Sequence, residues 1–272
     1  MPSKSVKPVN LKRKITRLAD GLRDLFGIPK RPRRANILDA LVETLLSQGT
    51  TDHNRDLAFR ELKRQFHDWE TAADATERAL ALAVKSAGLG NQKAARIFSI
   101  LQWLRSETGA LSLEFLHEKN DDVAVALLTQ HKGIGVKTAY VTLMWASSRD
   151  LFAVDVHIHR IAGRLGLIGD KIGPEKAHGE LGPHVPEGRA FELHMNMLAF
   201  GRTICTARNP KCTECCFRRM CPYLKSLKHG GAPLNEGGAK QAAFRATART
   251  TARKAKHPSS NRRPSSKKPG IN

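Results

Sequence analysis

Lys137 and Asp155 are the residues of this sequence best suited to chemistry. Lys137 lies in the glycine-rich segment KGIGVKTA, and Asp155 interrupts the apolar stretch AVDVHIHR. A lysine on the first turn of a helix has a lowered pKa, because the helix dipole and partial burial both disfavour the ammonium. A neutral amine is a nucleophile, and a buried carboxylate can assist it. The alternatives are a surface lysine that binds phosphate and an aspartate that only caps the next helix.

The stretches on either side of the glycines predict two helices joined by a tight hairpin. Apolar residues recur at helical spacing in DDVAVALLTQH before the glycines and in TAYVTLMWA after them. Gly133 and Gly135 allow a sharp turn and a close approach of the backbone to another molecule. The amides that begin the second helix, those of Gly135, Val136 and Lys137, would be unpaired donors that suit a nucleic-acid phosphate.

Helical periodicity also dominates the rest of the chain between residues 37 and 227, with no useful strand alternation. Two helices are predicted to meet at residues 49–52, with Thr51 or Asp52 as N-cap of the second, and Asn120 or Asp121 is predicted to cap a later helix. The sequence therefore predicts an all-α fold.

The N-terminal part is predicted to hold one short helix. LADGLRDLFGI is amphipathic, and Pro29 and Pro32 would end that helix. The following KRPRR could be a localisation signal, but a solvated linker that faces phosphate is the simpler interpretation.

Four cysteines near the end of the folded region are spaced as a ligand set. Cys205, Cys212, Cys215 and Cys221 form the pattern C-x6-C-x2-C-x5-C, compact enough for four thiolates to converge on one centre. The fifth cysteine, Cys216, is adjacent to Cys215, and adjacent residues rarely bind one centre together. The absence of a secretory signal argues against disulfides, and thiolate chemistry alone allows zinc or iron–sulfur.

Basic residues are concentrated at the two ends of the chain. Residues 1–36 hold 11 Lys or Arg against 2 Asp or Glu, and residues 229–272 hold 10 against 1, within a formal charge of +21 for 272 residues. Such ends add a salt-sensitive attraction to phosphates, unless they serve only solubility. No apolar run reaches membrane-spanning length. Residues 228–272 hold few large apolar side chains and are predicted to be disordered.

Five segments together resemble the endonuclease III branch of the helix-hairpin-helix DNA glycosylases. They are LLSQGTTD, AGLGNQKA, KGIGVKTA, AVDVHIHR and the cysteine cluster, which occur in the family's order between Ile37 and Tyr223. The resemblance implies two helical lobes with a DNA cleft between them. The implied organisation is a basic N-terminal segment packed on the cluster lobe (1–36), a six-helix barrel with the hairpin (37–150), an iron–sulfur lobe (151–227) and a basic tail (228–272).

The resemblance also implies a function in base excision repair. The implied enzyme removes oxidised pyrimidines from double-stranded DNA and cuts the resulting abasic site by β-elimination, with Lys137 as the Schiff-base nucleophile and Asp155 as its partner. It favours a 4Fe-4S cluster over zinc at the four cysteines. Its partner would be DNA with damaged bases or abasic sites, without a membrane, bound by a monomer in the cytoplasm and nucleoid if the source is bacterial. The implied DNA contacts are Gln48, Leu89, Gly133, Gly135, Val136, His157 and Arg160.

Three departures from the family pattern leave alternatives open. Gly49 stands where the family tends to have a gap-filling glutamine, and Gly90 follows Leu89, which leaves Leu89 as the main apolar wedge. The loop SSRDLFAVD lacks the expected Gly and Pro. One alternative is a monofunctional mismatch or alkylated-base glycosylase in which Asp155 activates water. The other is a non-catalytic, structure-specific DNA-binding protein.

Overall fold

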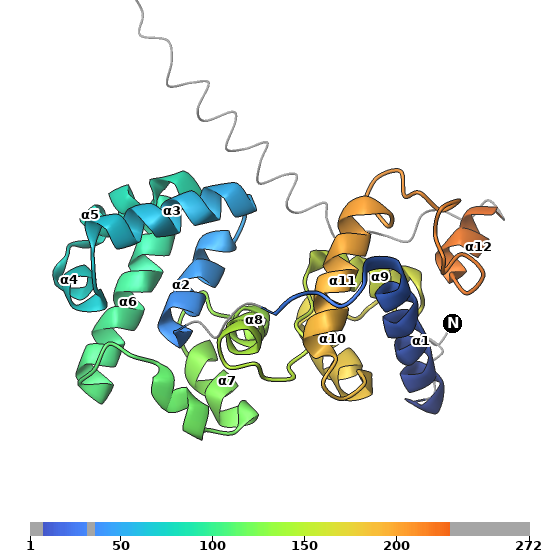
Figure 1. Ribbon diagram of the computed structural model, residues 1–272, viewed down its shortest axis with the longest axis horizontal. Coiled ribbons are helices and arrows are strands. Elements are labelled where there is room, and N and C mark those ends of the chain that lie inside the picture. Colours follow the sequence, from blue (N-terminus) through green and yellow to red (C-terminus); the bar gives the residue numbers. More distant parts are fainter. Residues whose placement is uncertain (1–7, 32–35, 229–272) are drawn as a thin grey trace, which may run out of the picture. The chain divides into compact units, whose positions relative to one another are not determined.

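The computed structural model describes residues 8–31 and 36–228, and within these residues the chain is helical with no strand (Figure 1). The predicted all-α fold is therefore confirmed. No helix in the described part is long and apolar enough to span a membrane. The predicted disorder of 228–272 falls, from residue 229 onward, outside the described residues.

The helices are α1 Pro8–Phe26, α2 Ile37–Ser47, α3 Asp52–Gln65, α4 Trp69–Asp74, α5 Glu77–Ala83, α6 Gly90–Thr108, α7 Asp121–Thr129, α8 Val136–Ala146, α9 Val156–Arg164, α10 Pro174–Leu181, α11 Ala190–Thr203 and α12 Pro222–Lys228, with short 3-10 turns η1 Lys85–Ala87, η2 Glu114–Glu118 and η3 Gly182–His184.

Helices α2 to α8 share one hydrophobic core. Helix α2 packs against α3 and α8, and α5 packs along α6. The core runs from Ile37 to Leu151 and is filled mainly by leucine, isoleucine and alanine side chains with almost no exposure. This burial is the main stabilising contribution to the group, at about 25 cal/mol per Å² of apolar surface.

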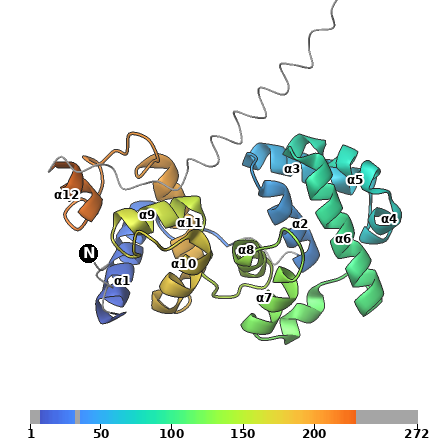
Figure 2. The ribbon, with the colours of Figure 1, turned by 180° about the vertical axis from the view of Figure 1, so that it is seen from behind.

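Helix α1 packs with α9 to α12 rather than with the helices that follow it in the sequence. It lies against α11, which also contacts α9. Glu192 on α11 ties the two together, since Arg23 Nη2 and Arg189 Nη2 donate to its carboxylate at 2.6 and 2.7 Å. Figures 1 and 2 both show α8 between this group and α2–α7. All described residues belong to one compact unit, and the proposed lobe boundaries stay a prediction.

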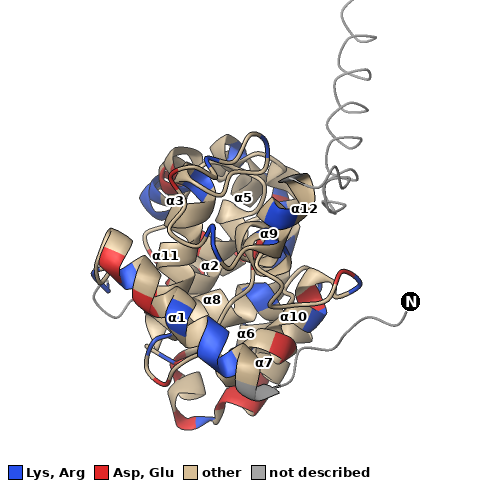
Figure 3. Cartoon of the chain, turned by 90° about the vertical axis from the view of Figure 1, so that its right-hand side faces the viewer, with Lys and Arg blue, Asp and Glu red and all other residues tan. Residues whose placement is uncertain are grey.

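Helix α1 is longer than predicted and ends for a different reason. It begins at Pro8, because Leu11, Ile15, Leu18 and Leu22 form a buried stripe against α11 in an otherwise charged sequence. Both signs of charge lie along it (Figure 3). The helix stops at Phe26, since Gly27 adopts a left-handed φ of 75° that terminates it ahead of Pro29.

The linker interpretation of KRPRR stays a prediction, but Arg31 within it makes contacts with the folded part. Its guanidinium donates to Met144 O at 3.0 Å and lies over the ring of Phe191. Arg31 therefore joins α8 to α11 although its residue is exposed, and residues 32–35 lie outside the described ranges.

Polar caps start the helices near the predicted chemistry. Thr51 Oγ1 accepts from the amide of Asn54, Asn120 Oδ1 accepts from the amide of Val123, and both confirm the predicted cap positions. The helices α3 and α7 therefore begin where their sequences require, which fixes the lengths of the loops before them.

Candidate active site

The glycine hairpin joins α7 to α8 in a conformation that only glycine accepts easily. Gly133 has a φ of 90°, and a Cβ at this position would overlap the guanidinium of Arg96. Ile134 is buried and anchors the turn in the core. Gly135 is the N-cap of α8 and has no side chain to bond the first amides of that helix. A helix start of this kind suits an anion, and the contact with phosphate stays a prediction.

Lys137 is the second residue of α8 and is only partly exposed. Burial lowers the pKa of Lys137, and the charge of Asp155 raises it by a smaller amount. The two side chains that were predicted to act together therefore lie close enough to interact, although they belong to α8 and to the start of α9.

Asp155 is held at the N-terminus of α9. Its Oδ1 accepts a hydrogen bond from the amide of Ile158 at 2.8 Å, which is the N-cap arrangement. Capping and chemistry are thus compatible, since only one carboxylate oxygen is used by this bond. Residues 151–154 before it are buried, so the carboxylate emerges from a fixed segment.

Two buried histidines fix the segment that leads to Asp155. His178 Nε2 accepts from the amide of Val154 at 3.0 Å, while its Nδ1 lies 3.0 Å from Pro174 O. His194 Nδ1 donates to Ala153 O at 2.8 Å. Burial lowers the pKa of both histidines, and the bond from Val154 requires an unprotonated Nε2 on His178. The bond from Val154 therefore keeps the His178 ring neutral, and the bond to Ala153 O holds the His194 ring in place.

Gln48 is engaged by the hairpin and by α6. Its Nε2 lies 3.4 Å from Gly133 O and 3.2 Å from Thr138 Oγ1, and its Oε1 accepts from Arg96 Nη1 at 2.7 Å. The predicted contact of Gln48 with DNA stays a prediction. The structure shows that this amide links the end of α2 to the hairpin.

Leu89 projects from the loop before α6 in a strained conformation. Its φ of 53° is left-handed, and its side chain is 54% exposed. Gly49 also has a positive φ, with open space where a Cβ would lie, whereas a Cβ on Gly90 would press on Ala81 O at 3.1 Å. Non-glycine residues hold such conformations where the surroundings impose them, often at functional sites.

His157 and Arg160 face the cysteine region. Arg160 donates to Gly201 O and Cys205 O at 2.9 Å each, and its Nη2 lies 3.2 Å from His157 Nδ1. His157 also packs against Gly201, where a Cβ would meet it at 3.0 Å. Their predicted roles in DNA binding stay predictions, and the contacts seen join α9 to α11 and to the start of the cysteine loop.

The four spaced cysteines interact with one another. Burial and the neighbouring thiols raise the pKa of Cys215 to about 11, and burial with Cys205 and Cys212 raises the pKa of Cys221. Arg164 contacts both the first and the last of the four cysteines. Its Nη1 donates to Cys205 Sγ at 3.5 Å, and its carbonyl accepts from Cys221 Sγ.

These thiols have the chemistry that an iron–sulfur cluster requires of its ligands. In the described ranges no set of three or more His, Cys, Asp or Glu has the geometry for a single bound metal. Iron bound to the four sulfurs would compensate thiolates that burial otherwise opposes. The donor set therefore fits an iron–sulfur cluster.

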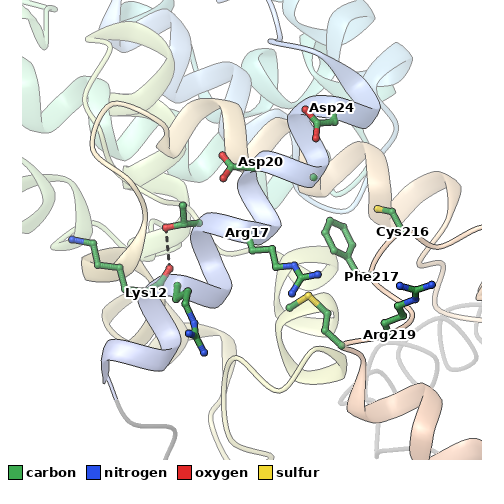
Figure 4. Close-up of a pocket in the computed structure, with 11 residues that line it drawn as sticks. Lys12, Arg17, Asp20, Asp24, Cys216, Phe217 and Arg219 are labelled. Atoms are coloured by element: carbon green, nitrogen blue, oxygen red, sulfur yellow. Dashed lines mark hydrogen bonds between the residues drawn. The ribbon is translucent and has the colours of Figure 1, made fainter.

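A cavity of about 800 Å³ lies between α1 and the cysteine loop (Figure 4). Its wall includes Cys216 and Phe217 on one side and Lys12, Arg17 and Asp20 on the other. It contains none of the predicted catalytic or DNA-binding residues, so it is separate from the site at Lys137.

Sequence reasoning missed several residues that organise this site. The burial of Lys93 could have been predicted from the sequence, because Lys93 shares helical spacing with the buried Ile97, Ile100 and Leu104. The role of Arg96 could not have been predicted in this way, because it depends on a hydrogen bond to Gln48, which is distant in the sequence. The missed residues are Lys93, Arg96, Thr138, His178 and His194.

Comparison with known proteins identifies the family. The family described as "HhH-GPD superfamily base excision DNA repair protein" matches residues 42–186. Endonuclease III of Rickettsia conorii is 33% identical over 194 residues, covering 71% of this chain and 87% of that protein. Endonuclease III of Thermotoga maritima is 30% identical over 202 residues, covering 74% and 90%. A putative DNA glycosylase of Arabidopsis thaliana is 33% identical over 171 residues, covering 63% of this chain and 58% of that protein.

The chain belongs to the HhH-GPD superfamily of base excision DNA repair proteins and is a DNA glycosylase of this type. Its similarity to endonuclease III confirms the predicted resemblance. A solved non-covalent endonuclease III–DNA complex superposes with a TM-score of 0.68 at 22% identity, over 80% of this chain and 98% of that one. A thermostable thymine-DNA glycosylase gives 0.66 at 18% identity, over 81% and 100%. These structures share the fold.

Proposed function

We propose that the protein is a bifunctional DNA glycosylase and abasic-site lyase that removes oxidised pyrimidines from double-stranded DNA. The observation that carries the proposal is the partly buried Lys137 on the first turn of α8, with a pKa lowered by burial and with Asp155 close enough to act on it. A lysine that only bound phosphate would gain nothing from a weakened positive charge. The similarity to endonuclease III supports the same reaction.

The chemistry requires the damaged nucleotide outside the helix stack, since C1′ is inaccessible within a duplex. The neutral amine of Lys137 attacks C1′, and the bond from C1′ to the base breaks with its electron pair leaving on the base. The carboxylate of Asp155 stabilises the positive charge that develops on the sugar. Opening of the sugar ring then gives a Schiff base between Lys137 and C1′.

Strand cleavage follows from that Schiff base. Loss of the 2′ proton forms a double bond between C2′ and C3′, and the 3′ phosphate leaves with the electrons of its bond to C3′. Hydrolysis releases the sugar from Lys137 and restores the amine. The amides at the start of α8 and the hairpin backbone at Gly133 to Val136 would hold a phosphate nearby.

The cysteine set supports a 4Fe-4S cluster with a structural role. Cys205, Cys212, Cys215 and Cys221 would hold it, and Arg164 donates toward one of these sulfurs. Such a cluster would fix the loop between α11 and α12, whose Arg208 and Lys211 would then face the DNA backbone. One bound duplex per chain suits a monomer, located in the cytoplasm and nucleoid if the source is bacterial.

Borohydride trapping tests the proposal directly. Duplexes with an abasic site or with thymine glycol are incubated with the wild type or with Lys137→Gln, and borohydride reduces any Schiff base to a stable adduct. We expect adducts on both substrates with the wild type and none with Lys137→Gln. Lys132→Gln, which changes an exposed lysine of the same hairpin, is the matched control and should retain trapping.

Other results of the trapping experiment would favour one of the alternative functions. Trapping on the abasic duplex alone would keep the lyase and reject oxidised pyrimidines as substrates. Base release without trapping, retained in Lys137→Gln, would favour a monofunctional glycosylase in which Asp155 activates water. Binding without any change in the DNA would favour the non-catalytic interpretation.

A further inference from the structure

Lys93 is a lysine enclosed in the helical core. It lies on α6, its residue is 1% exposed, and it occupies the apolar stripe that includes Ile97. Burial and the nearby charge of Arg96 lower the pKa of Lys93 to about 8. A buried cation is unfavourable unless it is hydrogen-bonded, and a leucine would fill this position without that penalty. The lysine therefore does something that an apolar residue cannot.

Its ammonium joins the ends of two separate elements. Lys93 Nζ donates to Leu46 O at 2.7 Å and to Ala87 O at 2.8 Å. Leu46 belongs to the last turn of α2, and Ala87 is the last residue of η1. Carbonyls at the C-terminal end of a helix lack partners within the helix and lie at its negative pole, so a cation is favoured there.

A loop follows each of these carbonyls within a few residues. Gln48 and Gly49 follow Leu46, and Gly88 and Leu89 follow Ala87. Gly49, Gly88 and Leu89 all have left-handed backbones, with φ between 53° and 70°. Both loops therefore leave their elements through sharp turns whose direction depends on how the preceding carbonyl is held.

Lys93 holds the second loop from both sides. Its backbone amide donates to Leu89 O at 3.0 Å, which is the first helical bond of α6, while its ammonium holds Ala87 O two residues earlier. The strained conformation of Leu89 is thus enclosed between two bonds from one residue. Arg96, one turn further along α6, reaches Gln48 in the first loop.

We propose that Lys93 is a positioning residue that couples the Gln48–Gly49 loop to the Gly88–Leu89 loop, so that both loops meet the DNA duplex as one unit. The coupling rests on the proposed function for its purpose, since these loops carry the residues expected to probe the duplex. The contacts that would produce the coupling are all within the free protein and do not depend on the proposed function. The two claims can therefore be tested separately.

The first test needs no DNA. Lys93→Met keeps the length and apolar volume of the side chain and removes its donors, while Lys119→Met makes the same change at an exposed position and serves as control. Hydrogen–deuterium exchange of the free protein is measured at residues 48–50 and 88–90. We expect Lys93→Met to speed exchange at least tenfold in both loops, and Lys119→Met in neither. Faster exchange in one loop alone, or equally throughout the chain, would overturn the coupling.

The second test measures the coupling in binding. Gln48→Ala, Leu89→Ala and the double variant are compared for affinity to a duplex with an uncleavable abasic analogue, first with Lys93 present and then in the Lys93→Met background. With Lys93 present, the fold loss of affinity in the double variant should differ at least threefold from the product of the fold losses in the two single variants. In the Lys93→Met background, the fold loss in the double variant should equal that product. An unchanged coupling would reduce Lys93 to a merely structural residue.

A folding defect would not leave the proposal undecided. If Lys93→Met does not fold, Lys93→Gln is used in both tests, because its shorter, uncharged amide cannot span the two carbonyls. Failure of the proposed function would give a different result. The wild type would then show no preference for the abasic-analogue duplex, while hydrogen–deuterium exchange in the two loops would still depend on Lys93.

Discussion

Asp155 acts on Lys137 in two opposed ways. Burial lowers the pKa of Lys137, and the carboxylate raises it in part, so Asp155 reduces the neutral amine available at a given pH. In the proposed reaction, the same carboxylate would stabilise the positive sugar once attack begins. The first effect sets the pH at which the amine becomes reactive, and the second sets the rate above that pH. The two effects can therefore be separated by a pH profile.

Asp155→Asn should move that profile and lower its plateau. Asparagine can still cap α9 through the amide of Ile158, so the fold is retained. Without the carboxylate the pKa of Lys137 falls further, and the midpoint of Schiff-base formation shifts to lower pH. The plateau should fall about 10²–10³-fold. Single-turnover trapping on abasic DNA across the range from acidic to alkaline pH measures both, with the rates of the wild type as reference. A midpoint that moves to higher pH would contradict the interaction.

The neutral His178 ring makes stability depend on pH. Burial lowers the pKa of His178 below its ordinary value of 6.5, so the unfolded chain binds its proton more readily than the folded protein does. The free energy of unfolding should therefore be highest above pH 6.5 and fall as the pH drops below it.

His178→Gln should flatten this dependence, because a glutamine oxygen can accept from Val154 without titrating. Urea unfolding at a series of pH values on both sides of the ordinary histidine pKa measures the effect, and His53→Gln on the exposed face of α3 is the control. If the pH dependence persists unchanged in His178→Gln, another group is responsible.

The residues that could be predicted are those whose position is encoded locally. Lys137 follows the glycines that start its helix, and Asp155 precedes the helix that it caps. The partners of His178 and His194 are 24 and 41 residues away, at Val154 and Ala153. Nothing in the nearby sequence distinguishes such histidines from solvated ones.

At the scale of elements, the two hairpin glycines have different physical roles. Gly133 needs its left-handed φ and the space filled by Arg96, whereas Gly135 has an ordinary φ of −91°, and a Cβ there would meet no atom closer than 3.9 Å. Gly133 therefore serves the fold. Gly135 is free to serve a bound molecule.

Alanine at each glycine tests this difference. Gly133→Ala should lower the free energy of unfolding by about 1–3 kcal/mol, through backbone strain and displacement of Arg96. Gly135→Ala should leave stability within about 0.5 kcal/mol but weaken binding to DNA, because the methyl group would stand where the backbone meets phosphate. Thermal melts and fluorescence anisotropy on abasic-analogue duplexes give both values. Unchanged affinity in Gly135→Ala would place the phosphate elsewhere.

Helix boundaries were predictable where capping residues mark them. The starts of α3 and α7 followed from Thr51 and Asn120. The start of α1 did not, because its apolar stripe is sparse among lysines and arginines and gains its stability from α11, far along the sequence. Packing between distant segments determined the length of this helix.

At the scale of the whole molecule, positive charge is concentrated outside residues 37–228, and we expect general attraction to DNA and selectivity to belong to different parts. Residues 37–228 carry a net charge of only +3, whereas residues 229–272 alone carry +9. Attraction to any duplex through such a segment weakens steeply with salt, since it depends on release of counterions. In the proposed function, recognition of a damaged site would depend instead on the hairpin, Leu89 and Lys137.

Deleting residues 229–272 should therefore weaken binding to every duplex without changing the preference among them. The slope of log affinity against log salt should become shallower, by about 0.9 for each phosphate that the shortened protein no longer neutralises. The ratio of affinities for an abasic-analogue duplex and an undamaged duplex should stay within twofold. A full-length variant with the ten Lys and Arg of this segment changed to Gln separates charge from chain length. A changed ratio in both variants would mean that the tail takes part in recognising the lesion, and the division between attraction and selectivity would fail.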